Sequence, residues 1–210
     1  MSSHHIVRDE QEPALYVHEA DNFLLEQLGD LLEWSPTVIA SARALKKVID
    51  FGIKVDQVFK GPTDELSDAL LASQRPIRFL KIAEEDFIGL LSHLEAAHYS
   101  GVNIATSARE AGHLMTTLEA YDGPIDCTVH TLSKRWIRIR QPIFEKWLNT
   151  GDYGFKAPNE KSITLHDGSR SPEHLRTRDY TFSKKEAGLL RVECREPPFW
   201  FVELTAPSAQ

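Results

Sequence analysis

The sequence has 210 residues, of which 41% are hydrophobic and 26% charged, which is ordinary for a globular protein of one large or two small domains. Its formal net charge of −7 argues against a nucleic-acid partner, which would need a basic face. No apolar run approaches the roughly 20 residues that span a bilayer. Residues 1–10 also lack the apolar core of a signal peptide, so we expect a cytoplasmic protein without a membrane partner.

Up to residue 129, short apolar runs typical of buried strands alternate with segments of helical periodicity. The expected strands are 14–17, 37–40, 55–59, 77–80, 102–105 and 125–129. The expected helices are 21–34, with Asp21 as the N-cap, 42–51, which ends before Gly52, and 64–72, 86–97 and 111–121. This alternation predicts an α/β fold, in which residues 1–131 form a parallel sheet with helices on both faces.

From residue 132 onward the pattern changes to alternating strands. Lys134–Arg140 alternates apolar and basic side chains, and apolar runs follow at 162–165, 189–194 and 199–204, with a turn of helix near Phe144–Trp147. We interpret the basic side of Lys134–Arg140 as a solvated strand face rather than a phosphate-binding site. The segment 132–210 is therefore expected to be a small C-terminal antiparallel β-sandwich.

Common catalytic motifs are missing from the sequence. It contains no P-loop, no G-x-G-x-x-G, no H-E-x-x-H and no G-x-S-x-G pattern. Cys127 and Cys194 lie far apart in apolar runs, so both are expected to be buried free thiols. His93 and His98 are five residues apart, on different faces of a helix, and are expected to be surface or capping residues.

Parallel sheets bind ligands at the carboxyl ends of their strands. The loops that matter are then 19–21, 41–43, 60–64, 81–86 and 106–113. The acidic run Glu84–Asp86 precedes an apolar segment, and it has two readings. It either complements the dipole at a helix N-terminus or turns a carboxylate toward a metal ion.

Several phrases of the sequence resemble the thiamin pyrophosphokinases, in the version found in Bacteroidetes. They are Leu31–Ile39, Ile53–Asp56 and Phe144–Trp147, together with the opening residues 2–15. The resemblance implies an α/β domain followed by a β-sandwich, in a homodimer. It also implies transfer of pyrophosphate from ATP to thiamin with Mg²⁺, a hard cation that clustered aspartates would hold.

A residue-by-residue comparison shows that this sequence has other residue types at most of the positions where the resemblance implies those aspartates. The positions expected to hold acids are occupied by Ala42, Gly61, Thr63, Lys81 and Gly112. The acid that opens the helix after the fourth strand is kept as Asp86, and the histidine that follows Gly112 is kept as His113. A one-residue slip would also align Asp64 with a metal-binding aspartate, which leaves Asp64 and Asp86 as the weak metal or catalytic candidates.

Two hypotheses remain open at this point. In the first, the chain is a non-catalytic relative that binds a nucleotide, a thiamin-like molecule or a protein partner, and no particular cofactor is implied. Its cleft would be formed by Lys60, Lys81, Glu85, Arg109 and His113.

In the second hypothesis the chain is a diverged but active thiamin pyrophosphokinase that uses Mg²⁺ and ATP. The metal would be held by the acids that remain in two of the strand-end loops, Asp64, Glu84, Glu85 and Asp86.

Overall fold

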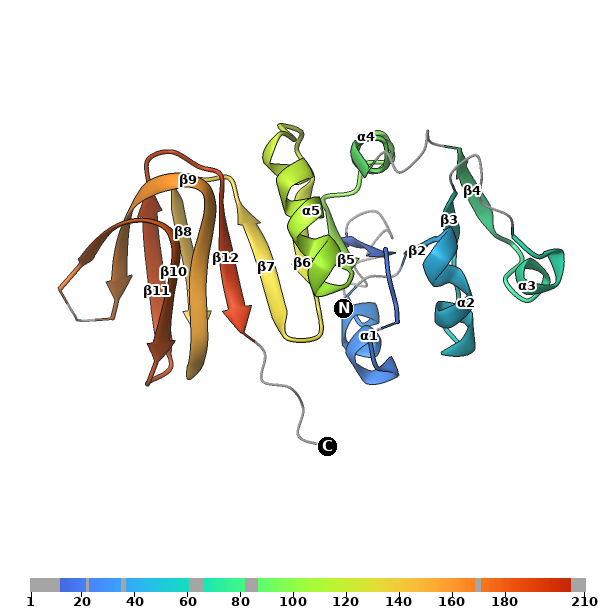
Figure 1. Cartoon of the computed structure of the whole chain (residues 1–210), viewed down its shortest axis with the longest axis horizontal. Coiled ribbons are helices and arrows are strands. Elements are labelled where there is room, and N and C mark those ends of the chain that lie inside the picture. Colours follow the sequence, from blue (N-terminus) through green and yellow to red (C-terminus); the bar gives the residue numbers. More distant parts are fainter. Residues whose placement is uncertain are drawn as a thin grey trace, which may run out of the picture. The chain divides into compact units, whose positions relative to one another are not determined.

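The computed structural model describes residues 12–21, 23–34, 37–60, 66–81, 87–168 and 171–204. The chain forms two compact units, the first ending at Leu132 and the second beginning at Ser133 (Figure 1). Within the described residues, no helix is long and apolar enough to cross a membrane.

A parallel sheet forms the centre of the first unit. Its strands are β1 (Ala14–Val17), β2 (Val38–Ser41), β3 (Gln57–Lys60), β4 (Arg78–Lys81), β5 (Gly101–Ala105) and β6 (Asp126–His130). They lie in the order β4-β3-β2-β1-β5-β6, and every pair is parallel, as the sequence predicts. The chain steps outward from β1 to β4 and then returns to β5 on the other side of β1. The strand order therefore reverses between β1 and β5, and ligands bind at such switch points in open α/β sheets.

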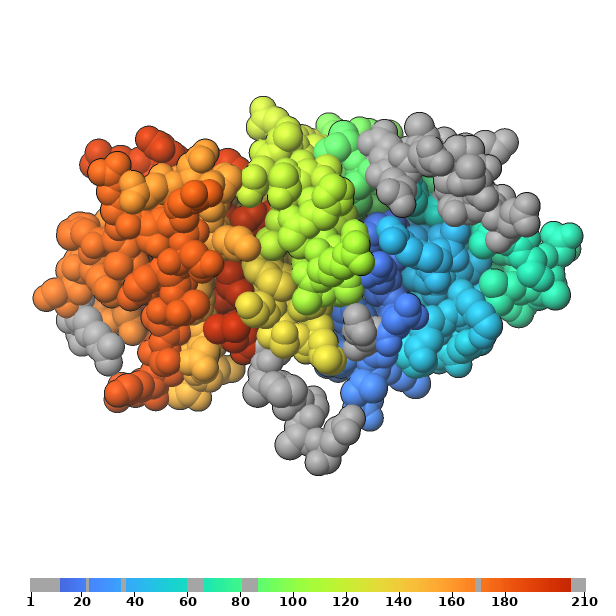
Figure 2. Space-filling model, viewed as in Figure 1, coloured from blue at the N-terminus to red at the C-terminus, as the bar shows by residue number. Residues whose placement is uncertain are grey.

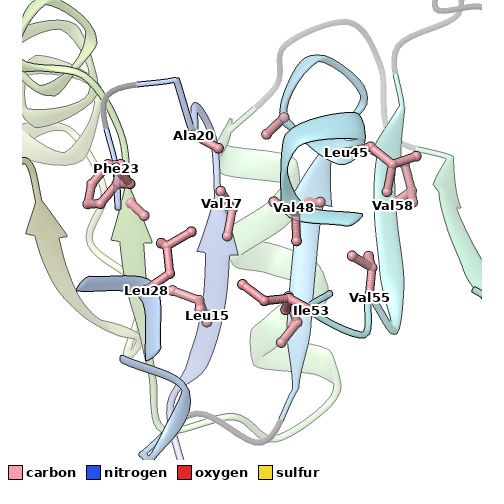
Figure 3. Packing of buried hydrophobic residues seen from close by; sticks show 14 residues of the cluster. Leu15, Val17, Ala20, Phe23, Leu28, Leu45, Val48, Ile53, Val55 and Val58 are labelled. Carbon is pink, nitrogen blue, oxygen red and sulfur yellow. The ribbon is translucent and has the colours of Figure 1, made fainter. Parts of the chain in front are cut away.

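Helices cover both faces of this sheet. They are α1 (Leu25–Leu32), α2 (Ala42–Asp50), α3 (Asp68–Ala72), α4 (Phe87–Ala96) and α5 (Ala108–Glu119). On one face, α1 and α2 bury a cluster that includes Leu15, Val17, Leu28, Leu45 and Val48 (Figure 3). On the other face, the Tyr16 ring lies 6.0 Å from the ring of Phe59 and 6.0 Å from the ring of Phe87. Phe87 is the first residue of α4.

The starts of α1 and α5 differ from the sequence-based expectation, and α3 begins at Asp68 rather than at residue 64. Asp21 is not an N-cap, because the chain first makes a turn in which the Phe23 amide donates to the Ala20 carbonyl. This turn places Phe23 in the core, and α1 begins only at Leu25. Conversely, α5 begins three residues earlier than predicted, at Ala108, because the Ser107 hydroxyl accepts the Glu110 amide and caps the helix.

The second unit consists of antiparallel strands, as expected. They are β7 (Lys134–Ile139), β8 (Ile143–Leu148), β9 (Gly151–Asp167), β10 (Glu173–Lys184), β11 (Gly188–Cys194) and β12 (Phe199–Leu204). Their order is β7-β12-β9-β11-β8, and β10 pairs with β9. The side chains of four aromatic residues, Phe155, Phe182, Phe199 and Phe201, pack together in its core.

Two expectations for this unit are wrong. Phe144–Trp147 is not a helical turn but part of β8, in which Phe144 faces Phe201 and Glu145 pairs with Arg191 on the opposite side. The even-numbered side of β7 is solvated only at its ends, at Lys134 and at Arg140, which follows the strand. Arg138 is buried there opposite Trp200, which is itself buried. The prediction of buried free thiols at positions 127 and 194 is confirmed.

Candidate functional site

Three polar side chains converge where β1 and β2 end, beside the switch point. His18 follows β1, and its Nδ1 lies 3.0 Å from the Tyr16 hydroxyl. Its Nε2 lies 2.8 Å from the Arg43 guanidinium, which comes from the first turn of α2. Arg43 also reaches the Glu19 carboxylate at 3.4 Å. A guanidinium can only donate, so Nε2 of His18 accepts and the proton of the neutral ring is on Nδ1, facing Tyr16.

The backbone around this cluster is fixed from both sides. The Ser41 hydroxyl donates to the His18 carbonyl at 2.7 Å and accepts the Ala44 amide at 3.1 Å, which joins the end of β1 to the start of α2. The amides of His18 and Glu19 both donate to the Ala105 carbonyl of β5, at 2.9 and 3.3 Å. The site is therefore built on element ends that hydrogen bonds hold in place.

Burial sets the charge state of His18 in this cluster. Burial lowers the pKa of His18 from 6.5 to about 4, and the positive charge of Arg43 adds to that shift. Glu19 opposes the shift, while His113 of α5 lowers the pKa further. His18 is therefore neutral at physiological pH, and the charges of the cluster are the opposite charges of Arg43 and Glu19.

The end of β5 adds an unusual hydroxyl group. Thr106 is fully buried, and within the described part of the chain its side-chain oxygen has no hydrogen-bond partner. Buried hydroxyl groups are nearly always paired, so this one has an unused capacity to donate and accept. Thr106 directly follows Ala105, whose carbonyl binds the end of β1, and it precedes the N-cap of α5.

The structure brings only some of the sequence-predicted residues together. His113 lies on α5 and acts electrostatically on His18, so it belongs to the cluster. Arg109 does not join it, because its side chain is 92% exposed and its nearest charged partner is the adjacent Glu110, at 3.8 Å. Figure 2 shows the surface formed by α5 (yellow-green), with α2 (light blue) visible on the same side.

Other predicted residues lie at or beyond the limits of the description. Lys60 and Lys81 end β3 and β4 and face each other in the strand register, but their side chains lie outside the described atoms. The remaining candidates, Asp64, Glu85 and Asp86, lie outside the described residues. His18 was not singled out from the sequence, where its only signal is a polar residue directly after a buried strand.

The described strand ends do not fit Mg²⁺. This ion prefers a cage of oxygen ligands, mostly carboxylates, water and phosphate. At the described ends of β1 and β2, the carboxylate of Glu19 is engaged by Arg43, whose positive charge would repel a divalent cation. Across the described residues, no group of three or more His, Cys, Asp or Glu side chains could hold a metal ion.

The second unit has a hollow of about 630 Å³ lined by residues of β8, β9, β10 and β11. The polar side chains that line it largely satisfy one another. Arg176 pairs with Glu160 at 2.8 Å, and His174 lies 3.1 Å from the Thr164 hydroxyl. This surface is better explained as a solvated sheet face than as a binding site.

No family model and no curated protein sequence matches this chain. Solved structures do resemble it. Thiamin pyrophosphokinase from Geobacillus thermodenitrificans superposes with a TM-score of 0.68 at 12% identity, covering 94% of this chain and 99% of that one. For thiamin pyrophosphokinase from Candida albicans the TM-score is 0.66 at 6% identity, and the superposition covers 92% of this chain and 89% of that one. A protein from Lactobacillus plantarum superposes with a TM-score of 0.68 at 11% identity, covering 93% of this chain and 99% of that one.

Proposed function

We propose that this chain, which has the fold of the thiamin pyrophosphokinases, is a non-catalytic relative of those enzymes. It would bind a nucleotide or a thiamin-like molecule at the carboxyl ends of its parallel strands without transferring pyrophosphate. The observation that carries the proposal is the cluster of His18, Glu19 and Arg43, in which the partly exposed guanidinium of Arg43 lies at the strand ends beside a neutral His18.

The chemistry of pyrophosphate transfer explains why this charge matters. Transfer from ATP relies on metal ions that bridge the phosphates and neutralise the charge that develops on them. Ala42 stands at the end of β2 where the sequence resemblance places an aspartate, and a methyl group cannot coordinate a metal. The next residue is Arg43, a cation. A strand end of this kind favours binding of an anion but provides no carboxylate to hold the ion that catalyses its transfer.

The function would involve more of the chain than this cluster. Residues 1–131 would correspond to the catalytic-type α/β domain of the thiamin pyrophosphokinases, and residues 132–210 to a β-sandwich of the thiamin-binding type. The ligand cleft would also include Lys60, Lys81, Glu85 and His113. The protein would act in the cytoplasm as a homodimer.

Binding is tested by thermal unfolding of the whole chain with ATP, ADP, thiamin and thiamin diphosphate, each with and without Mg²⁺. A ligand that binds the folded state at 100 times its Kd adds about 2.7 kcal/mol of stability. At about 2–4 °C per kcal/mol for a chain of this size, we expect one of these ligands to raise Tm by about 5–10 °C. The His18→Gln variant should show a smaller shift, whereas Arg109→Ala, at an exposed position away from the cluster, should respond like the wild type.

Absence of a Tm shift with every one of these ligands would contradict the binding function. Release of AMP that requires both thiamin and Mg²⁺ would contradict its non-catalytic character.

A further inference from the structure

The guanidinium of Arg43 is accessible and only weakly held by its acidic neighbour. Its side chain is 45% exposed, and its nitrogen lies 3.4 Å from the Glu19 oxygen, well beyond the usual 2.7–2.9 Å of a charge-assisted hydrogen bond. Its stronger contact, to His18, is with a neutral ring and leaves the positive charge uncompensated. A second anion could therefore approach Arg43 from solvent and compete with Glu19.

Groups around Arg43 also favour an anion. The pKa of His18 is lowered mainly by burial, and the effect of the nearby Arg43 charge on that pKa is larger than the opposing effect of Glu19. Helix α5 begins at Ala108, three residues after the end of β5, and has 12 residues, so the positive end of its dipole lies at the same edge of the sheet.

We infer that Arg43 binds a phosphate group of the ligand directly, without a divalent cation, and releases Glu19 when it does so. The planar guanidinium matches a phosphate with two parallel hydrogen bonds, a geometry that arginine provides and lysine does not. The inference rests on the proposed function, because it concerns the same strand-end site. It adds that arginine supplies the countercharge that a metal ion would otherwise provide.

The probe is inorganic pyrophosphate, titrated calorimetrically into the whole chain in buffer with EDTA. We expect the wild type to bind it, and we expect an excess of Mg²⁺ over EDTA to leave the affinity the same or weaker. Arg43→Ala should weaken binding at least tenfold, and Arg43→Lys should lie in between because it keeps the charge without the paired hydrogen bonds. The matched control is Lys46→Ala, which removes the same charge from the same helix at a 75% exposed position; it should stay within twofold of the wild type.

A second variant keeps the inference testable if Arg43→Ala fails to fold. Glu19→Gln removes the competing carboxylate and should tighten pyrophosphate binding several-fold. Pyrophosphate binding that requires Mg²⁺, that is unchanged in Arg43→Ala, or that weakens in Glu19→Gln would overturn the inference. If ADP or thiamin raises Tm while pyrophosphate without Mg²⁺ does not bind, this inference fails and the proposed function survives. If no ligand binds at all, both fail.

Discussion

Replacing Phe155 with alanine is expected to lower the free energy of unfolding by about 3–5 kcal/mol, the usual cost of deleting a buried phenylalanine ring. Phe155 is 1% exposed, at the centre of the aromatic core of the second unit. The rings of four residues lie within 6.4 Å of its own, measured between centroids, namely Tyr180, Phe182, Phe199 and Phe201. Phe155 and these four residues lie on β9, β10 and β12, and β9 is hydrogen-bonded to both of the other strands. The cavity left by the missing ring would therefore weaken the packing of all three strands.

The measurement is urea unfolding followed by circular dichroism. The matched control is Trp147→Ala, which removes a larger ring from the same unit at a position on β8 that is 67% exposed. That variant should change stability by about 0.5 kcal/mol or less. Equal losses in the two variants would show that the aromatic cluster is not the core of this unit.

Acid should destabilise the protein through His18. In the unfolded chain this histidine has a pKa of 6.5, whereas in the folded protein burial and Arg43 lower the pKa to about 4. Between these values the unfolded state binds a proton that the folded state does not, so stability falls as the pH is lowered. At about 1.4 kcal/mol for each pH unit between the two pKa values, the loss approaches about 3 kcal/mol near pH 4.

Comparison with His18→Gln isolates this contribution from other acid effects. At pH 7 the variant is less stable because it loses the ring contacts with Tyr16 and Arg43. The advantage of the wild type should then shrink by about 3 kcal/mol as the pH falls from 7 to 4. The control is His98→Asn, at an exposed position with φ +65°, a conformation that asparagine tolerates. A wild-type advantage over His18→Gln that stays constant with pH would contradict this assignment.

The parallel half of the fold could be predicted from the sequence because each of its strands contains apolar residues and segments of helical periodicity separate the strands. Strand β10 could not, although it has 12 residues. A bulge between Thr177 and Asp179 shifts its alternation, so that Leu175 faces the core from an odd position and Phe182 from an even one. The period-2 pattern is thus broken in the middle of the strand. Phe144–Trp147 was misread for a related reason, since a short alternating run between turns carries little periodic signal.

The candidate site was predictable as a place but not as a set of residues. Strand ends and their loops follow from the α/β alternation, and the loops containing Glu19 and Arg43 were identified in this way. The contact between His18 and Arg43 spans 25 residues of sequence. It depends on the register in which Val17 of β1 pairs with Ala40 of β2, which no local pattern encodes. Arg109 was singled out by resemblance to a motif, but its direction is set by its position on α5, where it points to solvent.

A relative that binds ligand but has lost the transfer chemistry should release no AMP from ATP. The most direct measurement is a coupled assay of AMP release with ATP, thiamin and Mg²⁺, performed on the same preparation in which ligand raises Tm. We predict a rate equal to the blank without protein, and no increase when Mg²⁺ or thiamin is added. AMP release well above the blank that depends on both thiamin and Mg²⁺ would contradict this prediction. It would instead favour an active enzyme whose metal is held by Asp64 and Asp86.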